Sequence, residues 1–497
     1  MDIPDPQKPD DGFSVLKQKS LTGIGTLLKR QIFVTGIAFL GNIALARILA
    51  PQMFGIYAIV AFVVQFFSVF SDVGIGAALI QKKEELTGEE TSTLFWLQQI
   101  LALAVVIATF VSSPLVIRIY PSLPASGIWL VRGMAVTFLF TSFKTVPTIL
   151  MERSLDFRKI ATVDIAEVAV FQGVAISLAI AGFGAWSFII AALLRGLSGV
   201  LLVYALYPWR PSLTCHFDAV KELIRFGIPY QGSAILSFLK DAVTPLFVGA
   251  YVGAAGVGYV NWAREVAFVP LVLSQSFAKV AFPAFSRLQH DRDLLKGAIE
   301  RSLRMMTFVM FPITAILMAL APGIIKTVFT DKWMPAINAY YFYCTSPFVI
   351  GIVLPLYSGI LALGKSGILM KMAILLLFLE WGLGVPFVLA FGFNGIAFNQ
   401  PIVAMVFLYV YKQVLAREGI VVEILKNVWN PIVTSCIVGI AVKLASGWLT
   451  ISLPNIGILF VLGGSLFLAL QYILKKEVIL EFHDYAMEIL GFSRGKA

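Results

Sequence analysis

Apolar stretches long enough to cross a lipid bilayer recur along almost the whole chain. A helix that crosses about 30 Å of hydrocarbon needs roughly 20 mostly apolar residues. Fourteen windows meet this condition, with approximate cores at 24–47, 56–80, 92–119, 127–150, 161–182, 184–207, 226–251, 256–285, 302–329, 334–362, 366–391, 393–415, 428–448 and 454–475. Only 13% of the residues are charged and the mean hydropathy is +0.88. A water-soluble globular protein of this composition would have too few polar residues to cover its surface. The sequence therefore predicts an all-α polytopic membrane protein with about 14 transmembrane helices.

Lys and Arg are distributed unevenly between the gaps that separate these windows. Alternate gaps and the two chain ends together hold 25 of them, whereas the other gaps hold only Arg47, Arg118 and Lys332. Short basic loops stay on the cytoplasmic side of a membrane, so both termini are predicted to be cytoplasmic. The net charge of +10 is then explained by topology and by contact with anionic membrane lipids. No nucleic-acid partner is expected.

The residues that catalysis or metal binding would need are scarce and scattered. Cys215, Cys344 and Cys436 lie far apart, and none of the three histidines falls within a predicted span. No Cys or His set has the spacing of metal ligands. The gaps are also too short to hold a catalytic or ATP-hydrolysing domain. We therefore expect no enzyme activity, no cofactor and no metal site.

One segment matches the phosphate-binding P-loop pattern G-x4-G-K-S, from Gly359 to Ser366. That loop binds phosphate only between a buried strand and a helix, in a domain that also supplies an acid for magnesium. Here the segment joins one apolar span directly to the next. We therefore interpret it as a tight cytoplasmic turn, with Lys365 following the positive-inside rule.

The order of spans suggests two halves with the same orientation. Residues 50–55 and 253–258 are similar short turns that end in glycine before a helix with aromatic residues. Parallel halves that rock around a central site are a transporter architecture. The predicted domains are a polar cytoplasmic leader (1–22), an N-lobe of helices 1–6 (23–207), a cytoplasmic amphipathic linker (208–225), a C-lobe of helices 7–12 (226–415), helices 13–14 (416–475) and a cytoplasmic tail (476–497).

A set of short motifs resembles one family of membrane proteins. The motifs are Phe54-Gly-Ile-Tyr57, Asp72-Val-Gly-Ile-Gly-Ala-Ala-Leu-Ile-Gln81, Glu152-Arg-Ser-Leu-Asp-Phe157, Gly182-Phe-Gly-Ala-Trp-Ser187, Phe226-Gly-Ile-Pro229, Pro283-Ala-Phe-Ser-Arg-Leu288, Lys332-Trp-Met-Pro335 and Leu363-Gly-Lys365. In this order and spacing they resemble the polysaccharide flippases of the multidrug/oligosaccharidyl-lipid/polysaccharide exporter superfamily, and among them the Wzx-type lipopolysaccharide and colanic-acid exporters. The resemblance covers roughly residues 21–415.

The resemblance implies a V-shaped pair of six-helix lobes that open alternately to the two sides of the bacterial inner membrane. Its implied function is to move an undecaprenyl-pyrophosphate-linked oligosaccharide from the cytoplasmic to the periplasmic leaflet, for lipopolysaccharide or exopolysaccharide synthesis. The implied partners are this lipid-linked substrate, membrane lipids, H⁺ or Na⁺ as the coupling ion, and a polysaccharide polymerase as a candidate. A drug or cation antiporter of the same superfamily is the alternative, although it predicts a cavity dominated by acids.

Charged residues deep in the predicted spans are the candidate site residues, because each is costly in hydrocarbon unless it is paired or faces water. The candidates for the pyrophosphate-sugar headgroup are Arg195, Lys240, Arg264, Lys144 and Lys279, and those for ion coupling are Asp241, Glu265 and Glu380. A structural ion pair is the alternative for each of them. Lys240 and its neighbour Asp241 point in different directions on a helix, so each is expected to find a partner elsewhere. Five further cations near span ends are expected to extend to the interface, namely Lys29, Arg30, Arg132, Lys326 and Lys443.

Overall fold

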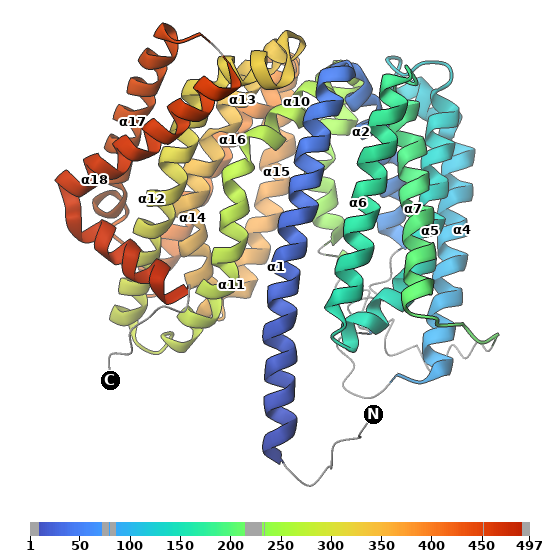
Figure 1. Cartoon of the computed structure of the whole chain (residues 1–497), viewed down its shortest axis with the longest axis horizontal. Coiled ribbons are helices and arrows are strands. Elements are labelled where there is room, and N and C mark those ends of the chain that lie inside the picture. The colour runs from blue at the N-terminus through green and yellow to red at the C-terminus, as the bar shows by residue number, and fades with distance from the viewer. Residues whose placement is uncertain are drawn as a thin grey trace. The chain divides into compact units, whose positions relative to one another are not determined.

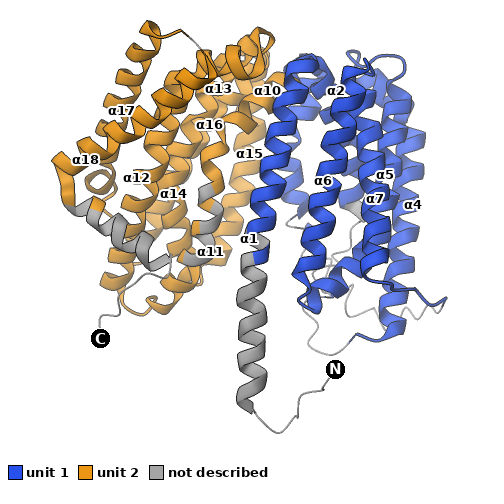
Figure 2. Ribbon diagram, in the orientation of Figure 1, with its two compact units in different colours: residues 1–257 blue, residues 258–497 orange. Residues whose placement is uncertain are grey.

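The computed structural model describes residues 9–71, 79, 86–213, 231–232, 234–450 and 452–489. These residues form helices joined by short turns, and no β-strand occurs among them. Twelve helical segments of the described part are long and apolar enough to cross a membrane. The predicted all-α polytopic membrane fold is therefore confirmed. The chain divides into two compact units, residues 1–257 and 258–497, which Figure 2 colours blue and orange.

The described residues of unit 1 form six long helices in chain order, followed by a shorter helical segment. They are α1 (Pro9–Ile48), α2 (Pro51–Ser71), α4 (Gly88–Ile119), α5 (Gly127–Arg153), α6 (Phe157–Ile180), α7 (Trp186–Leu206) and the segment 234–251 with its π-helical turn η1 (Thr244–Val248) and α9 (Gly249–Tyr251). Helix α6 packs against α1 and α7, and α7 packs against α5, so these neighbours lie side by side in Figure 1. This arrangement lets side chains of α6 meet side chains of three other helices.

The segment 234–251 packs on the other helices of unit 1. The ring of Phe238 stacks on that of Phe62 of α2, with centroids 5.3 Å apart. At Gly249 the backbone comes so close to the α4–α5 turn that a β-carbon would lie 2.9 Å from the Tyr120 ring. Burial raises the pKa of Tyr120 to about 12, so this phenol is neutral at physiological pH. Because of such contacts, the boundary between the units falls after Val257, beyond the seventh predicted span. Most of the predicted linker and the first residues of that span, 214–230, lie outside the described residues.

Unit 2 begins in the middle of helix α10, and its described residues contain eight further helices of seven or more residues. Its elements are α10 (Ala254–Ala267), η2 (Val269–Leu271), α11 (Val272–Arg287), α12 (Arg292–Ile324), η3 (Ile325–Phe329), η4 (Asp331–Ala336), α13 (Ile337–Tyr343), α14 (Thr345–Ala362), α15 (Ser366–Phe391), α16 (Asn394–Arg417), α17 (Ile424–Trp448) and α18 (Leu453–Ile489). A core cluster that includes Leu295, Ile299 and Leu356 joins α12 and α14.

The predicted span 256–285 is not one continuous helix. Helix α10 ends at Ala267, and a short 3-10 turn with Pro270 separates it from α11. Proline lacks a backbone N–H and its ring crowds the preceding turn, which interrupts an α-helix. Neither α10 nor α11 alone is of spanning length, and α16 falls outside the twelve apolar helices. Fourteen therefore remains the predicted number of spans, of which twelve are supported by length and composition.

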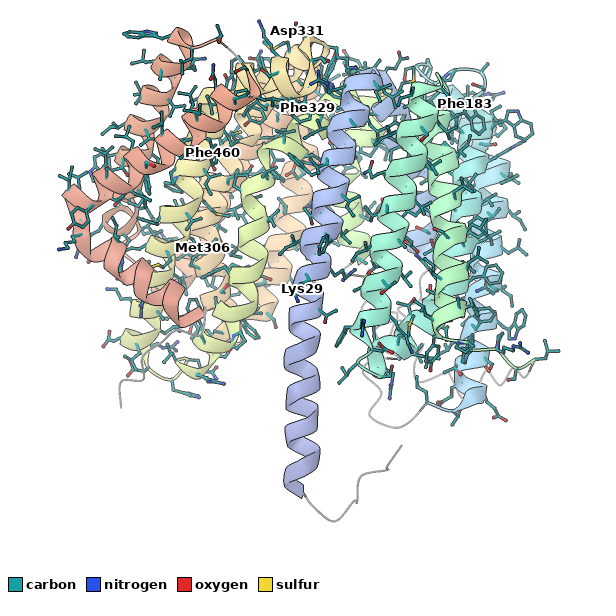
Figure 3. All side chains as sticks on the ribbon, viewed as in Figure 1. Lys29, Phe183, Met306, Phe329, Asp331 and Phe460 are labelled. Carbon is teal, nitrogen blue, oxygen red and sulfur yellow. The ribbon has the colours of Figure 1, made fainter. Side chains whose placement is uncertain are left out.

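The end of α12 departs from regular helical geometry. The chain passes through the π-helical turn η3 and then the 3-10 turn η4, and Phe329 and Asp331 mark this junction in Figure 3. Between them Thr330 has φ +102°, a conformation that is rare for a residue with a β-carbon. Trp333, which follows, is fully buried and stacks on Trp262 at 5.2 Å. Tertiary packing thus holds a turn that the local sequence does not favour.

The last two helices of unit 2, α17 and α18, pack on the rest of the unit and on each other through apolar and polar contacts. Val438 and Val442 of α17 belong to one buried cluster with residues of α12 and α18. Gln471 of α18 is fully buried, donates a hydrogen bond to Thr434 Oγ1 at 2.7 Å and accepts one from Asn430 Nδ2 at 3.2 Å. Such hydrogen bonds hold helices together in an apolar surrounding.

The P-loop-like segment is a turn between two helices, as predicted. Helix α14 ends at Ala362 and α15 starts at Ser366, so no strand precedes the glycines. Gly364 adopts φ +72°, which suits a residue without a β-carbon. Lys365 forms an ion pair with Glu418, with Nζ 2.9 Å from Oε1.

Candidate functional site

Helix α6 carries two carboxylates on one face, three residues apart. Asp164 and Glu167 are one helical turn from each other, and this face meets α1, α5 and α7. The local start of α6 is set by Asp156, whose side chain accepts a hydrogen bond from the backbone N–H of Lys159. Each of the three neighbouring helices contributes one cation to these two acids.

Glu167 lies at the centre of this group of charges. Its Oε1 accepts a short hydrogen bond from Lys144 Nζ of α5, and its Oε2 lies 3.4 Å from Arg195 Nε of α7. The side chain of Glu167 is 3% exposed, that of Lys144 21% and that of Arg195 46%. Two predicted headgroup residues are therefore brought together by a buried carboxylate.

The depth of these residues along their helices is similar. With about 1.5 Å per residue, Lys144 lies about 14 Å from the Arg153 end of α5. By the same measure Glu167 lies about 15 Å from the Phe157 start of α6. Both values are near half of the roughly 30 Å thickness of bilayer hydrocarbon. Lys144 and Glu167 thus meet at the same level, about 14–15 Å from these helix ends.

A second ion pair joins α1 to α6. Arg30 Nε lies 2.6 Å from Asp164 Oδ2, and both side chains are about one third exposed or less. Arg30 thus has a partner on α6, and its extension to the membrane interface stays a prediction. Asp164 and Glu167 were not among the site residues predicted from the sequence. Both acids lie inside the predicted span 161–182. A carboxylate inside a span requires a partner, so this position could have identified them as site candidates.

Lys240 and Asp241 pair with each other. Lys240 Nζ lies 3.0 Å from Asp241 Oδ1, with the two side chains 30% and 59% exposed. The expectation that each has a separate partner is therefore wrong, because the long lysine side chain reaches across to its neighbour. The pair lies one turn before η1, and π-helical turns are frequent at functional sites.

Arg264 and Glu265 lie in the last turn of α10, just before the break at Pro270. Arg264 is half-buried, and in the described part of the chain it makes no ion pair or side-chain hydrogen bond. A cation is favoured at this end of a helix because backbone carbonyls concentrate negative charge there. Glu265 is exposed. The interrupted helix places both charges at a discontinuity, a feature that transporters use at binding sites.

Glu380 of α15 is held by amide side chains of α16. Its carboxylate accepts hydrogen bonds from Asn399 Nδ2 at 3.0 Å and from Gln400 Nε2 at 3.1 Å. Glu380 is partly buried and Asn399 fully buried. The side chain of Lys279, the remaining predicted headgroup residue, lies outside the described residues.

The chain is similar to proteins of polysaccharide export. Residues 44–338 match the family described as polysaccharide biosynthesis protein. The lipopolysaccharide biosynthesis protein WzxC of Escherichia coli (strain K12) is 25% identical over 371 residues, which are 73% of this chain and 74% of WzxC. The succinoglycan biosynthesis transport protein ExoT of Rhizobium meliloti (strain 1021) is 28% identical over 300 residues, 60% of each chain.

The fold is similar to that of a solved flippase. The structure of the lipid II flippase MurJ in an inward closed conformation superposes with a TM-score of 0.73, covering 91% of this chain and all of MurJ at 14% identity. This likeness concerns the fold alone. The resemblance predicted from short motifs is confirmed by the family match, which extends over more than half of the chain. The chain therefore belongs to the polysaccharide biosynthesis protein family of membrane proteins.

Proposed function

We propose that this protein is a flippase for a lipid-linked oligosaccharide. Its substrate is an undecaprenyl-pyrophosphate-linked repeat unit, and it moves the polar head from the cytoplasmic to the periplasmic leaflet for surface polysaccharide synthesis. The family match and the similarity to WzxC and ExoT support this function. The MurJ-like fold agrees with a substrate that keeps its lipid tail in the membrane.

The observation that carries the proposal is the group of cations around the buried carboxylate of Glu167, inside the membrane-spanning helices of unit 1. A pyrophosphate-sugar head cannot enter hydrocarbon, whereas a polyisoprenyl tail can remain there. The protein need only shelter the head, and guanidinium and ammonium groups match its phosphates. Arg195, which is 46% exposed, is the member of the group that is accessible to such a head. Lys144, Lys240, Arg264 and Lys279 complete the proposed headgroup set.

Ion coupling forms the second part of the proposal. Asp241, Glu265 and Glu380 are carboxylates in or beside spans, and a carboxylate can bind H⁺ or Na⁺ in one state and release it in another. A change of occupancy would bias the two units between inward-open and outward-open arrangements. An ion gradient rather than ATP then supplies direction.

The proposed location is the bacterial inner membrane, with both termini in the cytoplasm. The support is the distribution of Lys and Arg between the gaps and the apolar helices of the described part. A polysaccharide polymerase on the periplasmic side is the proposed acceptor of the product.

Transport in sealed vesicles tests the proposal. Purified protein is reconstituted with a fluorescent undecaprenyl-pyrophosphate oligosaccharide, and the fraction that a membrane-impermeant quencher reaches is followed over time. The expected result is translocation that requires the protein and slows when proton and sodium gradients are collapsed together. Failure to translocate the lipid-linked sugar contradicts the function, and translocation unchanged by collapse of both gradients contradicts the coupling alone.

A further inference from the structure

The two contacts of Glu167 differ in geometry. Its Oε1 accepts a hydrogen bond from the ammonium of Lys144, whereas its Oε2 contacts only the inner nitrogen of Arg195, at 3.4 Å. Lys144 is mostly covered and Arg195 is nearly half exposed. The lysine is thus held by the carboxylate, while the arginine is oriented by it and remains accessible.

The orientation leaves the outer edge of the Arg195 guanidinium available. A guanidinium has five N–H donors in a planar fork. Only Nε contacts Glu167, and within the described residues the two terminal amines form no hydrogen bond or ion pair. The ring of Phe171 lies 6.0 Å from Cζ and backs one face of the group. Two parallel N–H donors of a guanidinium match two oxygens of a phosphate.

Gly199 of α7 makes room for the carboxylate. A β-carbon at position 199 would lie 1.8 Å from Glu167 Oε1 and 2.7 Å from Cδ. Glycine inside a helix costs about 1 kcal/mol relative to alanine. Its presence here is explained by the space that Glu167 needs between α5 and α7.

The charges of the group also favour an anion. Lys144 and Arg195 carry two positive charges and Glu167 carries one negative charge, so the three side chains together are net positive. Lys144 forms an ion pair with Glu167 and offsets its negative charge. The charge of Arg195 is therefore the one left for a ligand.

We propose that Glu167 is a positioning residue, which holds Arg195 so that its terminal amines face a phosphate of the lipid-linked substrate. This inference rests on the proposed flippase function. In this arrangement the phosphate binds to the terminal amines of Arg195 and does not displace Glu167. The guanidinium then lies between the carboxylate and the phosphate. Lys144 keeps Glu167 in place.

A double variant separates positioning from simple charge balance. In Glu167→Gln alone, Lys144 and Arg195 lose their common counter-charge, and the variant can lose stability. In Lys144→Met/Glu167→Gln the extra cation is also removed, which restores charge balance in the core. Binding of undecaprenyl pyrophosphate to each protein in nanodiscs is measured together with membrane abundance and vesicle transport.

Because Lys144 belongs to the proposed headgroup set, Lys144→Met alone is the reference that shows what its loss does to binding. The double variant is expected to reach normal abundance but to bind the probe about tenfold more weakly than Lys144→Met, a loss similar to that caused by removing orienting partners at metal sites. Glu167→Asp with Lys144 retained is expected to recover part of the affinity, since the carboxylate is kept. If the double variant binds and transports as Lys144→Met does, Glu167 only neutralises Lys144 and the inference is overturned.

Two glycine variants give a test that leaves Glu167 unaltered. Gly199→Ala is expected to push the carboxylate away and weaken binding of the same probe. Gly173→Ala on α6 is the matched control, because a β-carbon there meets nothing within 4 Å. Equal affinity in the two variants overturns the inference. An unaltered protein that binds no undecaprenyl pyrophosphate overturns the proposed function itself, and this inference with it.

Discussion

The carboxylate of Glu380 on α15 accepts a hydrogen bond from Asn399 Nδ2 on α16, at 3.0 Å. Gln400 donates to the same carboxylate at 3.1 Å. Two neutral amides from one helix therefore fix the orientation of an acid on the next. Amides can donate to a carboxylate or accept from its protonated form. Binding of H⁺ or Na⁺ to Glu380 would therefore change the hydrogen bonds between α15 and α16.

Glu380→Gln is expected to abolish the stimulation of transport by an ion gradient. Glutamine keeps the size of the side chain but neither ionises nor supplies a charge to a cation. Transport of the fluorescent substrate is measured in vesicles with and without an imposed proton or sodium gradient. Glu423→Gln, at an exposed carboxylate before α17, is the control and should respond as the unaltered protein does. A Glu380→Gln variant with a full gradient response would exclude Glu380 from coupling.

Arg195→Ala and Arg264→Ala are each expected to lower transport by about 10- to 100-fold, because a hydrogen bond to a charged group contributes about 1.5–3 kcal/mol. Membrane abundance should be unaffected. Complementation of a flippase-deficient strain and quantitative blotting provide the two readouts. Lys443→Ala removes an exposed cation of α17 and serves as the control. Full complementation by both arginine variants would refute the assignment of the headgroup site.

Gly249→Ala is expected to destabilise unit 1. The added β-carbon would lie 2.9 Å from the Tyr120 ring and 3.2 Å from Ile59, and overpacking of this kind costs about 1–3 kcal/mol. The temperature of thermal unfolding in detergent should fall. Gly36→Ala in α1, where nothing lies within 4 Å, should leave that temperature the same or raise it. Equal unfolding temperatures for the two variants would show that the segment 234–251 does not pack this closely.

Gln471→Leu is expected to weaken the attachment of α18 to α17. The variant removes a buried amide that donates to Thr434 and accepts from Asn430, and such contacts between membrane helices contribute about 1 kcal/mol or less each. Limited proteolysis after α17 should become faster. Ile473→Leu, an exposed apolar exchange two residues away, is the comparison. Unchanged proteolysis in Gln471→Leu would mean that apolar packing alone holds the last helix.

Hydropathy was sufficient to predict most of the helices, and the resemblance of short motifs to known flippases predicted the family. Each span is a local property, since about 20 apolar residues must satisfy their own backbone hydrogen bonds in lipid. The same local rule wrongly predicted one continuous helix over 256–285. The residues around Pro270 are apolar, so hydropathy does not reveal the helix break there. It also did not show that residues 234–251 pack on unit 1, because that depends on Phe62 and Tyr120, which are more than a hundred residues away in sequence.

The candidate site was predicted in part. Arg195 and Lys144 were singled out because charges inside apolar spans are costly, and the same reasoning applied to Asp164 and Glu167 would have added their partners. Which cation pairs with which acid could not be predicted from the sequence. Arg30 meets Asp164 and Arg195 meets Glu167 only because α1 and α7 pack on either side of α6.

The sequence by itself thus determined that this chain is an all-helical membrane protein and where most spans lie, since these follow from the transfer of each segment from water to hydrocarbon. Its short motifs also determined which family it resembles. Only the tertiary structure decided which buried charges share a partner and which remain accessible. That outcome depends on the close approach of helices, as at Gly199, where the absence of one β-carbon leaves room for Glu167 to hold two cations from different helices.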